Sequence, residues 1–390
     1  MNIFFSTFCV TKLNGTYFRA YYLARELAKR GHSITLASIS PNSKFKKIES
    51  TDSNLKILEY PNLFHKLIFH FGNGPLDIAQ RTNHLINGNY DVVHGFEYYA
   101  NVNIPILLTK KMKKYVYVSD WCDWFSKGMA TKGRRFASWS PIINTISKIE
   151  DITRLYAHGV TVISDEIEEH VRSIGIPDKK ILRIPGGSPT DLIKPLDKIK
   201  SRKELGYPTD AKISLFLGNY QADLDIFVRA FQLLKMKNPN SKLVIIGLIS
   251  NNISKLIKEL KLEKHIIEVG PVEPVNLSTY MATADLFFLP LRDTEGNRSR
   301  WPNKIGDYMA SGRPIVASEV GEIVPIMKTN NIGVLVGNNI NEIVTSTEWL
   351  LNNPKIADGM GSNARVLAET EYSWSSLAEQ LENFYSSLLN

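Results

Sequence analysis

Short apolar runs alternate with amphipathic segments along the first half of the chain. An apolar run at 2–10 precedes a stretch of helical spacing at 17–30, and Gly31 separates that stretch from a second apolar run at 33–39. Apolar runs of this length, joined by helices, predict parallel strands in a βαβ arrangement. Residues 41–53 are predicted to form a polar loop. Further strands are predicted at 91–94, 115–118, 159–163 and 181–184, and helices at 141–157 and 165–173.

The same alternation restarts in the second half, after the glycine- and proline-rich break at 185–189. The tail from 340 is predicted to be helical, with an interruption near 359–361 and a last helix that starts near 371–374. Strands are predicted at 213–217, 243–246, 266–269, 285–291, 315–317 and 333–336, and helices at 223–237, 252–261 and 277–283.

Two successive βα repeats in 390 residues predict an α/β protein with two doubly wound domains. The predicted domains are 1–195 and 196–370, followed by a terminal helix at 371–390. The polar, lysine-rich stretch at 190–200 is the predicted linker.

Composition and charge narrow the class of protein. A hydrophobic fraction of 43% with 22% charged residues is typical of a folded globular chain. No apolar run approaches the length of a membrane helix, and the N-terminus lacks the basic segment of a signal peptide. Cys9 and Cys122 lie in apolar surroundings without metal-ligand spacing, which predicts buried thiols in a reducing, cytoplasmic compartment.

The net charge of +8 is unevenly distributed. Residues 1–150 hold 20 Lys and Arg against 10 Asp and Glu, whereas the remaining residues hold 27 against 29. Such asymmetry indicates an anionic partner for the first domain: nucleic acid, an acidic polymer or an anionic membrane surface. A lysine-rich surface that only maintains solubility is the alternative.

The most informative stretch, 293–318, follows the predicted strand at 285–291. It reads D-T-E-G-N-R-S-R-W-P-N-K-I-G-D-Y-M-A-S-G-R-P-I-V-A-S. Arg298, Arg300 and Lys304 would lie at the carboxyl end of a parallel strand, where cations and free amides favour a phosphorylated ligand. The stretch therefore predicts a nucleotide-sugar site, with a solvated helix face as the plain alternative for the three cations.

Two segments of the first domain are candidates for binding other substrates. S-D-W-C-D-W-F at 119–125 places two acids and two tryptophans just past a predicted strand. Rings stack on sugar faces and carboxylates accept sugar hydroxyls, so sugar binding and a packed aromatic corner both stay open. The aromatic segment at 60–73 is either a helix lying on a membrane or a buried helix or wall of an acceptor groove. Gly15, at the first strand-to-helix turn, allows a ligand to approach the backbone. Lys127 to Arg135 adds four cations in a loop that contains Gly.

Several motifs, in the right order, resemble the large family of retaining GT-B glycosyltransferases known as family four. L-A-R-E-L-A-K-R-G-H-S-I-T resembles the opening helix and strand, and A-H-G-V-T-V-I-S and I-L-R-I-P-G-G resemble the segments that close the first domain. W-P-N-K-I-G-D-Y-M-A-S-G-R-P-I-V-A-S, at 301–318, is the most specific match. Y-S-W at 372–374 resembles the start of a terminal helix that crosses back to the first domain.

The resemblance implies two facing Rossmann-like domains and transfer of a sugar from a nucleoside diphosphate with retention, without cofactor or metal. Glycan or lipid-linked acceptors at the inner membrane face are expected, and no nucleic acid. The implied site residues divide by role. Arg298, Arg300 and Lys304 hold the leaving diphosphate with Asp120 as a further catalytic residue; Gly15, Gly218, Glu295, Gly296, Asn297 and Asp307 bind the donor; Trp121, Asp123 and Trp124 bind the acceptor.

The chain also departs from the family pattern. The family carries two glutamates around this loop, whereas here Asp307 occupies the second position and Ser299 the first. No cation follows Gly218, and Ser119 replaces a common histidine. Two other functions therefore stay open. One is a catalytically silent GT-B protein acting as a partner or sugar-binding subunit, and the other is a non-hydrolysing nucleotide-sugar epimerase.

Overall fold

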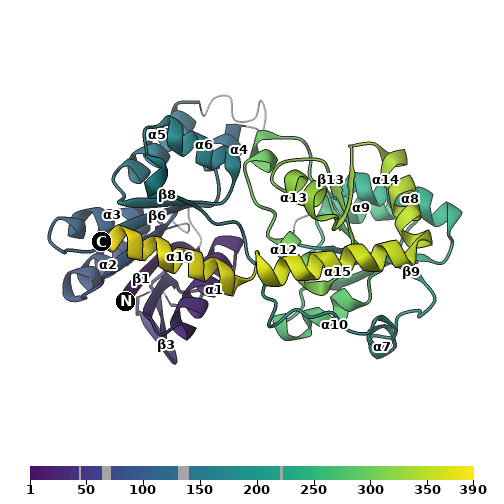
Figure 1. Cartoon of the computed structure of the whole chain (residues 1–390), viewed down its shortest axis with the longest axis horizontal. Coiled ribbons are helices and arrows are strands. Elements are labelled where there is room, and N and C mark those ends of the chain that lie inside the picture. Colours follow the sequence, from purple (N-terminus) through teal and green to yellow (C-terminus); the bar gives the residue numbers. More distant parts are fainter. Residues whose placement is uncertain (44, 64–71, 131–139, 220–222) are drawn as a thin grey trace. The chain divides into compact units, whose positions relative to one another are not determined.

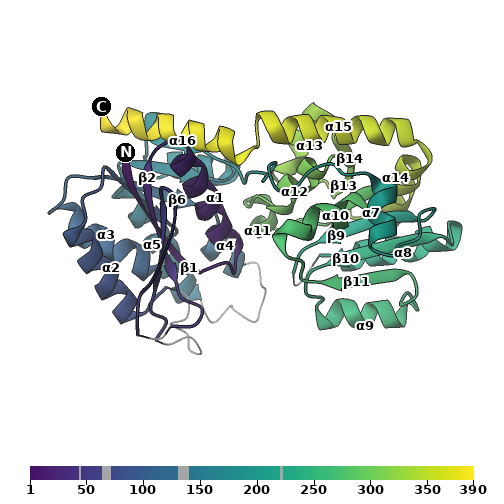
Figure 2. The ribbon, with the colours of Figure 1, turned by 90° about the horizontal axis from the view of Figure 1, so that it is seen from below.

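The chain folds into two compact α/β units (Figures 1 and 2). The computed structural model describes residues 1–43, 45–63, 72–130, 140–219 and 223–390. Unit 1 comprises Met1–Gly186, Ser299–Trp301 and Trp374–Asn390, and unit 2 comprises Gly187–Arg298 and Pro302–Ser373. Within the described residues, no helix is long and apolar enough to cross a membrane.

Unit 1 is built on an eight-stranded sheet in the order β3-β4-β2-β1-β5-β6-β7-β8. All neighbouring strands are parallel except β3 and β4. The strands are β1 (Asn2–Val10), β2 (Ser33–Ile39), β3 (Ile48–Asp52), β4 (Leu55–Tyr60), β5 (Val92–Phe96), β6 (Val116–Trp121), β7 (Gly159–Val162) and β8 (Ile181–Arg183). The helices are α1 (Gly15–Lys29), α2 (Pro75–Asn87), α3 (Ala100–Lys110), α4 (Phe125–Ala130), α5 (Ser140–Leu155), α6 (Asp165–Ser173), η3 (Asp178–Lys180) and α16 (Trp374–Leu389).

Unit 2 contains a six-stranded parallel sheet in the order β11-β10-β9-β12-β13-β14. The strands are β9 (Lys212–Leu217), β10 (Ser241–Ile246), β11 (Ile266–Gly270), β12 (Leu286–Leu289), β13 (Ile315–Ser318) and β14 (Gly333–Val336). The helices are α7 (Lys198–Glu204), α8 (Asp225–Lys237), α9 (Asn251–Glu259), η4 (Pro274–Asn276), α10 (Leu277–Ala282), α11 (Glu295–Arg298), α12 (Lys304–Ser311), α13 (Ile323–Asn330), α14 (Ile340–Asn352) and α15 (Pro354–Thr370).

The predicted fold of two doubly wound domains is confirmed. The central strands β1, β9 and β12 are apolar runs because helices cover both faces of a parallel sheet. The terminal helix α16 packs on unit 1, where Trp374 stacks on Tyr22 and the Tyr385 hydroxyl hydrogen-bonds His94 at 2.6 Å.

Three sequence predictions differ from the structure. Residues 48–52 form β3, an exposed edge strand whose polar pattern suggested a loop. Helix α15 runs through 359–361 without interruption, and the helical break falls instead at Asn353–Pro354, where the proline starts a new helix. Strand β4 and helices α2, α3, α4, α7, α11 and α13 were not predicted.

The first and longest segment of unit 1 ends at Gly186, a little before the predicted boundary at 195. The segment that follows belongs to unit 2 because its polar groups are bonded there. The Ser188 hydroxyl donates to the Gly306 carbonyl at 2.6 Å, and the Ser278 hydroxyl donates to the Leu192 carbonyl at 2.8 Å. Most of the aromatic segment at 60–73 and of the loop from Lys127 to Arg135 lies outside the described residues.

Candidate functional site

A lysine at the start of α12 lies over the carboxyl end of the unit 2 sheet. Lys304 is the first residue of the helix, and its Nζ is 4.1 Å from the centre of the Phe216 ring on β9. Tyr308, one turn later, fixes the position of the helix. Its hydroxyl donates to the Phe288 carbonyl at 3.1 Å and accepts the Leu217 amide at 2.9 Å. The ammonium group is therefore held where a parallel sheet of this kind binds ligands.

Gly218 directly follows β9 and leaves room for this lysine. A Cβ at Gly218 would lie 3.0 Å from Lys304 Nζ, and its φ of 147° is one that side-chain-bearing residues rarely adopt. The next loop packs against it, because the Leu248 amide donates to Asn219 Oδ1 at 2.7 Å and a Cβ at Gly247 would lie 2.6 Å from the Gly218 carbonyl. The predicted donor residue Gly218 and the predicted cation Lys304 are thus adjacent.

Asp307 lies one helical turn after Lys304, on the same face of α12. It is partly exposed, and burial raises the pKa of its carboxyl to about 7, although the Lys304 ammonium lowers it. A cation beside a glycine loop suits a phosphate, and an ionised carboxylate accepts hydrogen bonds from hydroxyl groups. This pairing suits the diphosphate and ribose of a nucleotide.

The loop after β12 is held by its own hydrogen bonds, which corrects part of the predicted donor site. The backbone N–H of Asn297 donates to the Thr294 carbonyl at 3.0 Å, and the side-chain amide of Asn297 donates to the Asp223 carboxylate at 3.0 Å. The Asn297 backbone amide was predicted to hold the donor sugar. Because it and the Asn297 side chain are already hydrogen-bonded, neither is free to do so. Glu295 is exposed and Gly296 partly exposed, so their predicted roles in binding the donor stay predictions.

Arg292 is a cation that the sequence prediction missed. Its guanidinium lies 2.6 Å from Asp225, the first residue of α8, and 3.4 Å from Asp223, which precedes that helix. The only signal in the sequence was the pair of acids, Asp223 and Asp225, where the family pattern has a cation.

The three predicted phosphate-binding cations are not equivalent. Arg298 is exposed and forms a two-pronged pair with Asp293, at 2.6 and 2.8 Å. Arg300 belongs to unit 1, in the short segment where the Ser299 carbonyl accepts the Ser164 hydroxyl at 2.7 Å. Of the three, only Lys304 has a described contact with the loop around Gly218 in unit 2.

In unit 1, Asp120 is a structural acid, which corrects its assignment as a catalytic residue that faces substrate. The carboxylate is fully buried at the end of β6 and accepts Arg19 Nη2 at 2.9 Å and the Thr161 hydroxyl at 2.6 Å. Burial alone would raise the pKa of Asp120, but the Arg19 guanidinium outweighs it and lowers the pKa. His94 beside it is buried and bonded to Tyr385 and Thr161.

Glu97, also missed from the sequence, organises the loop that follows Asp120. It sits just after β5 with a φ of 73° and accepts the backbone amides of Cys122 and Asp123, both at 2.8 Å. Arg154 approaches at 3.2 Å, and burial raises the pKa of Glu97 to about 8 against the effect of that arginine. A strained backbone at a buried acid marks a position fixed by its surroundings.

The loop held by Glu97 presents Asp123 and Trp124. Asp123 is partly exposed, and burial raises its pKa to about 6, although the Arg300 guanidinium lowers it. Trp124 is partly exposed too, with Lys127 Nζ 3.8 Å from the centre of its ring. The predicted acceptor residues Asp123 and Trp124 are therefore accessible.

Trp121 is not accessible, so its predicted role in acceptor binding is wrong. The ring is fully buried, and its centre lies 4.3 Å from the Arg154 guanidinium carbon. Trp121 thus fits the alternative prediction of a packed aromatic corner. Gly15 is exposed at the first position of α1, where the Asn14 side chain caps the helix by accepting the Tyr17 amide at 3.3 Å.

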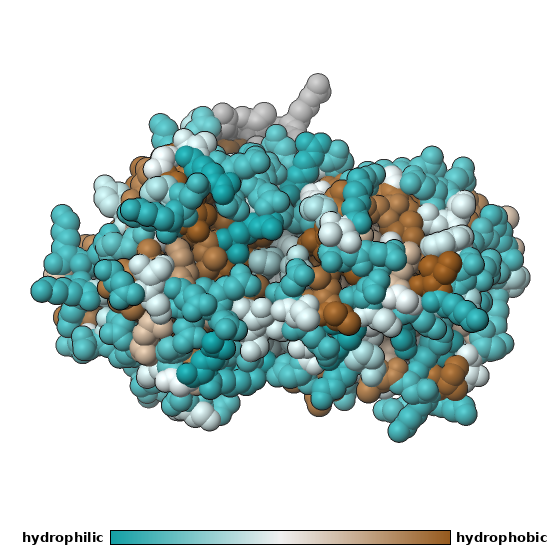
Figure 3. All heavy atoms as spheres, viewed as in Figure 1, coloured by the Kyte–Doolittle hydropathy of each residue, from teal (hydrophilic) through white to brown (hydrophobic). Residues whose placement is uncertain are grey.

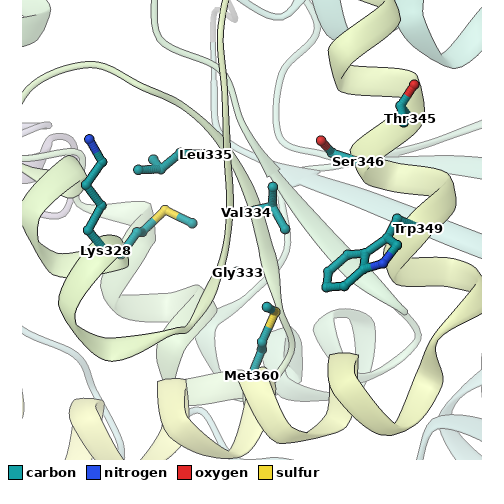
Figure 4. A pocket seen from close by; sticks show the side chains of 9 residues that line it. Lys328, Gly333, Val334, Leu335, Thr345, Ser346, Trp349 and Met360 are labelled. Atoms are coloured by element: carbon teal, nitrogen blue, oxygen red, sulfur yellow. The ribbon is translucent and has the colours of Figure 1, made fainter.

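A separate cavity of about 550 Å³ in unit 2 carries none of this chemistry. Figure 4 shows Trp349 and Met360 near Val334 of β14, and hydrophobic surface gathers between α13 and α14 in Figure 3. Its only charged lining residue, Lys328, pairs with Glu319 at 2.6 Å. Within the described residues, no group of three or more His, Cys, Asp or Glu could hold a metal ion.

Two family models match the chain. Residues 197–367 match the family described as glycosyl transferases group 1, and residues 13–192 match the one described as glycosyltransferase family 4. Among curated relatives, a D-inositol 3-phosphate glycosyltransferase of Corynebacterium aurimucosum is 27% identical over 55% of the chain. The chain spans only 52% of that relative's own length.

Solved structures agree on the fold. Sucrose-phosphate synthase from Thermosynechococcus elongatus superposes with a TM-score of 0.81 at 18% identity, over 100% of this chain and 99% of that one. HepE of Anabaena, solved in complex with UDP-glucose, superposes with a TM-score of 0.71 at 15% identity, over 99 and 100% of the two chains.

Proposed function

The chain belongs to the GT-B glycosyltransferases of the group 1 family, and from this premise we propose that it transfers a sugar from a nucleoside diphosphate to a glycan or lipid-linked acceptor. The observation that carries the proposal is the position of Lys304 in unit 2. Its ammonium lies beside the Gly218 loop and one turn before Asp307, a combination that suits a diphosphate and a ribose.

The leaving diphosphate determines what the protein has to supply. Cleavage of the bond between the sugar and the phosphate leaves additional negative charge on the diphosphate, and fixed cations lower the barrier by stabilising that charge. Lys304 is the residue we propose for this role. Asp307 would accept the ribose hydroxyls in its ionised form. We further propose that transfer retains the anomeric configuration and needs no metal ion.

Unit 1 supplies the acceptor side of the proposed reaction. Asp123 is an accessible carboxylate that can accept an acceptor hydroxyl, and Trp124 offers a ring face to a sugar. The basic excess of the first domain supports an acceptor carried by an anionic membrane or polymer. The nucleotide, the sugar and the linkage are left open by this proposal.

One observation favours a second candidate, a silent GT-B protein that binds a nucleotide without turnover. Ser299, where the family carries its first glutamate, is buried, with its carbonyl bonded to Ser164. A nucleotide-sugar epimerase needs a histidine for elimination chemistry. His94 in unit 1 does not suit this role, because it is buried and both of its ring nitrogens are hydrogen-bonded.

A thermal-shift screen of nucleoside diphosphates and their sugars tests the proposal first, since ligand binding raises Tm by mass action. Donors that bind are then tested for hydrolysis and transfer, with Lys304→Ala as the control. Binding with turnover that Lys304→Ala abolishes supports the glycosyltransferase. Binding without turnover of any donor supports the silent protein, and no binding at all overturns both.

A further inference from the structure

Helix α5 of unit 1 has its polarity reversed. Its inward face holds Glu150 and Arg154, both with no exposed surface, whereas its outward face carries isoleucines. Ile142, Ile149 and Ile152 are between 41 and 50% exposed, and Tyr156, the residue after the helix ends, is 58% exposed. These four positions share one side of a helix and form a row about 20 Å long. A helix that turns apolar side chains outward over this length needs a partner for them.

A second apolar row lies on helix α3 and the turn that follows it. Ile104, Leu108 and Met112 follow one another at intervals of four residues and are 42, 59 and 68% exposed. The two rows meet at their carboxyl ends, because Lys110 Nζ donates to the Tyr156 carbonyl. Both helices belong to unit 1 (Figures 1 and 2). We call the two rows together the α3–α5 face.

The exposed charges along the two rows are mainly basic. Residues 100–114 contain four lysines, at 110, 111, 113 and 114, and no acid. On α5, Lys148 is exposed, while Glu150 is buried and Asp151 accepts the His170 ring at 2.8 Å. Exposed apolar side chains among lysines are what an anionic lipid surface binds.

We propose that the α3–α5 face is a docking surface for an anionic lipid bilayer. The apolar rows enter the boundary between head groups and acyl chains, and the exposed lysines Lys111, Lys114 and Lys148 contact the lipid phosphates. A second copy of the chain fits this face less well, because the lysine run of one copy would meet the same run of the other. The proposal refines the proposed function, because it names the surface that would contact the membrane carrying a lipid-linked acceptor. Its biological role rests on the proposed function, whereas the binding of lipid does not.

Co-sedimentation of the full chain with vesicles tests the proposal. We expect binding to phosphatidylcholine vesicles that contain phosphatidylglycerol, and none to phosphatidylcholine alone. The double variant Leu108→Glu/Ile152→Glu should lose at least about tenfold in affinity, since two inserting side chains become anionic. Binding should also fall when salt rises from about 0.1 M to about 1 M, which shortens the Debye length from about 10 Å to about 3 Å.

Met236→Glu is the matched control, because Met236 is 69% exposed on α8 of unit 2. It should bind the vesicles as the unchanged protein does. Absence of binding to anionic vesicles overturns the proposal, and so does binding that the double variant leaves unchanged. A dimer in solution that the double variant dissociates would identify a second copy as the partner and overturn it as well.

Nucleotide binding separates this proposal from the proposed function. The double variant should show the same thermal shift with nucleoside diphosphates as the unchanged protein, which proves that its fold is intact. If no nucleotide binds the unchanged protein while anionic vesicles do, the glycosyltransferase proposal fails and the docking surface stands.

Discussion

Arg19 of α1 and Asp120 of β6 form an ion pair inside unit 1, with Nη2 and Oδ1 2.9 Å apart. Both side chains are almost completely buried, at 2 and 0% exposure. Arg19 also donates to the Pro185 carbonyl at 3.0 Å, so that the pair joins the first helix to the last segment of the main part of the unit. A pair buried to this extent is costly to break from one side, because the other charge loses its counter-ion.

We therefore expect Asp120→Asn to destabilise the fold rather than to act only on turnover. The loss should be about 3–5 kcal/mol in the free energy of unfolding, since the Arg19 guanidinium stays buried without its carboxylate. Urea denaturation followed by far-UV circular dichroism measures it. Asp178→Ala is the control, because Asp178 pairs with Arg172 at the surface and its loss should cost no more than about 1 kcal/mol.

If the Asp120→Asn variant unfolds at the same urea concentration as the unchanged protein but has lost turnover, then Asp120 acts on the substrate rather than on stability.

Lys304→Ala should weaken the binding of nucleoside diphosphates about 10- to 100-fold. The reason is the loss of a charge-assisted contact worth about 1.5–3 kcal/mol, at about 1.4 kcal/mol for each factor of ten. Isothermal titration calorimetry measures the change. Arg298→Ala should change affinity by less than about fivefold, because Arg298 is engaged in an exposed pair with Asp293. Equal losses in the two variants would show that the loop arginine reaches the ligand as well.

Nucleotide binding should weaken as the pH falls through about 7. Asp307 accepts hydroxyl hydrogen bonds only when ionised, and burial raises the pKa of this carboxyl to about 7. Each pH unit below that value should cost up to about a factor of ten in affinity. Titrations of a nucleoside and of its diphosphate at several pH values check this, because the nucleoside lacks a titrating phosphate. In Asp307→Asn the pH dependence for the nucleoside should disappear.

The same residue should make stability depend on pH in the opposite way from a salt-bridged acid. In the unfolded chain Asp307 loses its proton near 3.8, while in the folded chain it keeps the proton up to about 7. The folded state binds more protons in this window, so stability falls as the pH rises through it. Asp307→Asn should therefore have a higher Tm than the unchanged protein at pH 8 and lose that advantage at pH 4. A Tm difference that does not change with pH would show that Asp307 is not buried enough to titrate late.

The sequence could predict what depends on local pattern. Helix 165–173 was predicted with the bounds of α6, because Ser164 caps its start and Gly175 follows its end. Lys304 and Asp307 could be grouped from the sequence because their spacing puts them on one face of a helix. Strand β3 could not be predicted, since its polar residues are exposed and it forms only by pairing with β4.

The predictions that failed concern residues whose role depends on partners far away in the sequence. Asp120 looked like an accessible acid at the end of a strand, and only the fold brings Arg19 to it from 101 residues away. Glu97 has no local motif, because its role arises from the amides of a loop about 25 residues later. Trp121 and Trp124 have the same composition around them, but Trp121 is the last residue of β6, which is buried on both faces, whereas Trp124 lies in the loop that follows.

Two glycines of α15 offer a last test, because they differ only in their surroundings. Gly361 faces the backbone of unit 2, where an added Cβ would lie 2.3 Å from the Gly312 carbonyl, whereas a Cβ at Gly359 meets nothing within 4 Å. Gly359→Ala should stabilise the protein by about 0.5–1 kcal/mol, since alanine favours the helix. Gly361→Ala should destabilise it by about 1–3 kcal/mol, because the two backbones have to separate. Thermal denaturation of both variants gives the comparison. Two stabilising alanines would mean that α15 does not lie against Gly312, and two destabilising ones would mean that the helix is interrupted near 359–361, as its glycines first suggested.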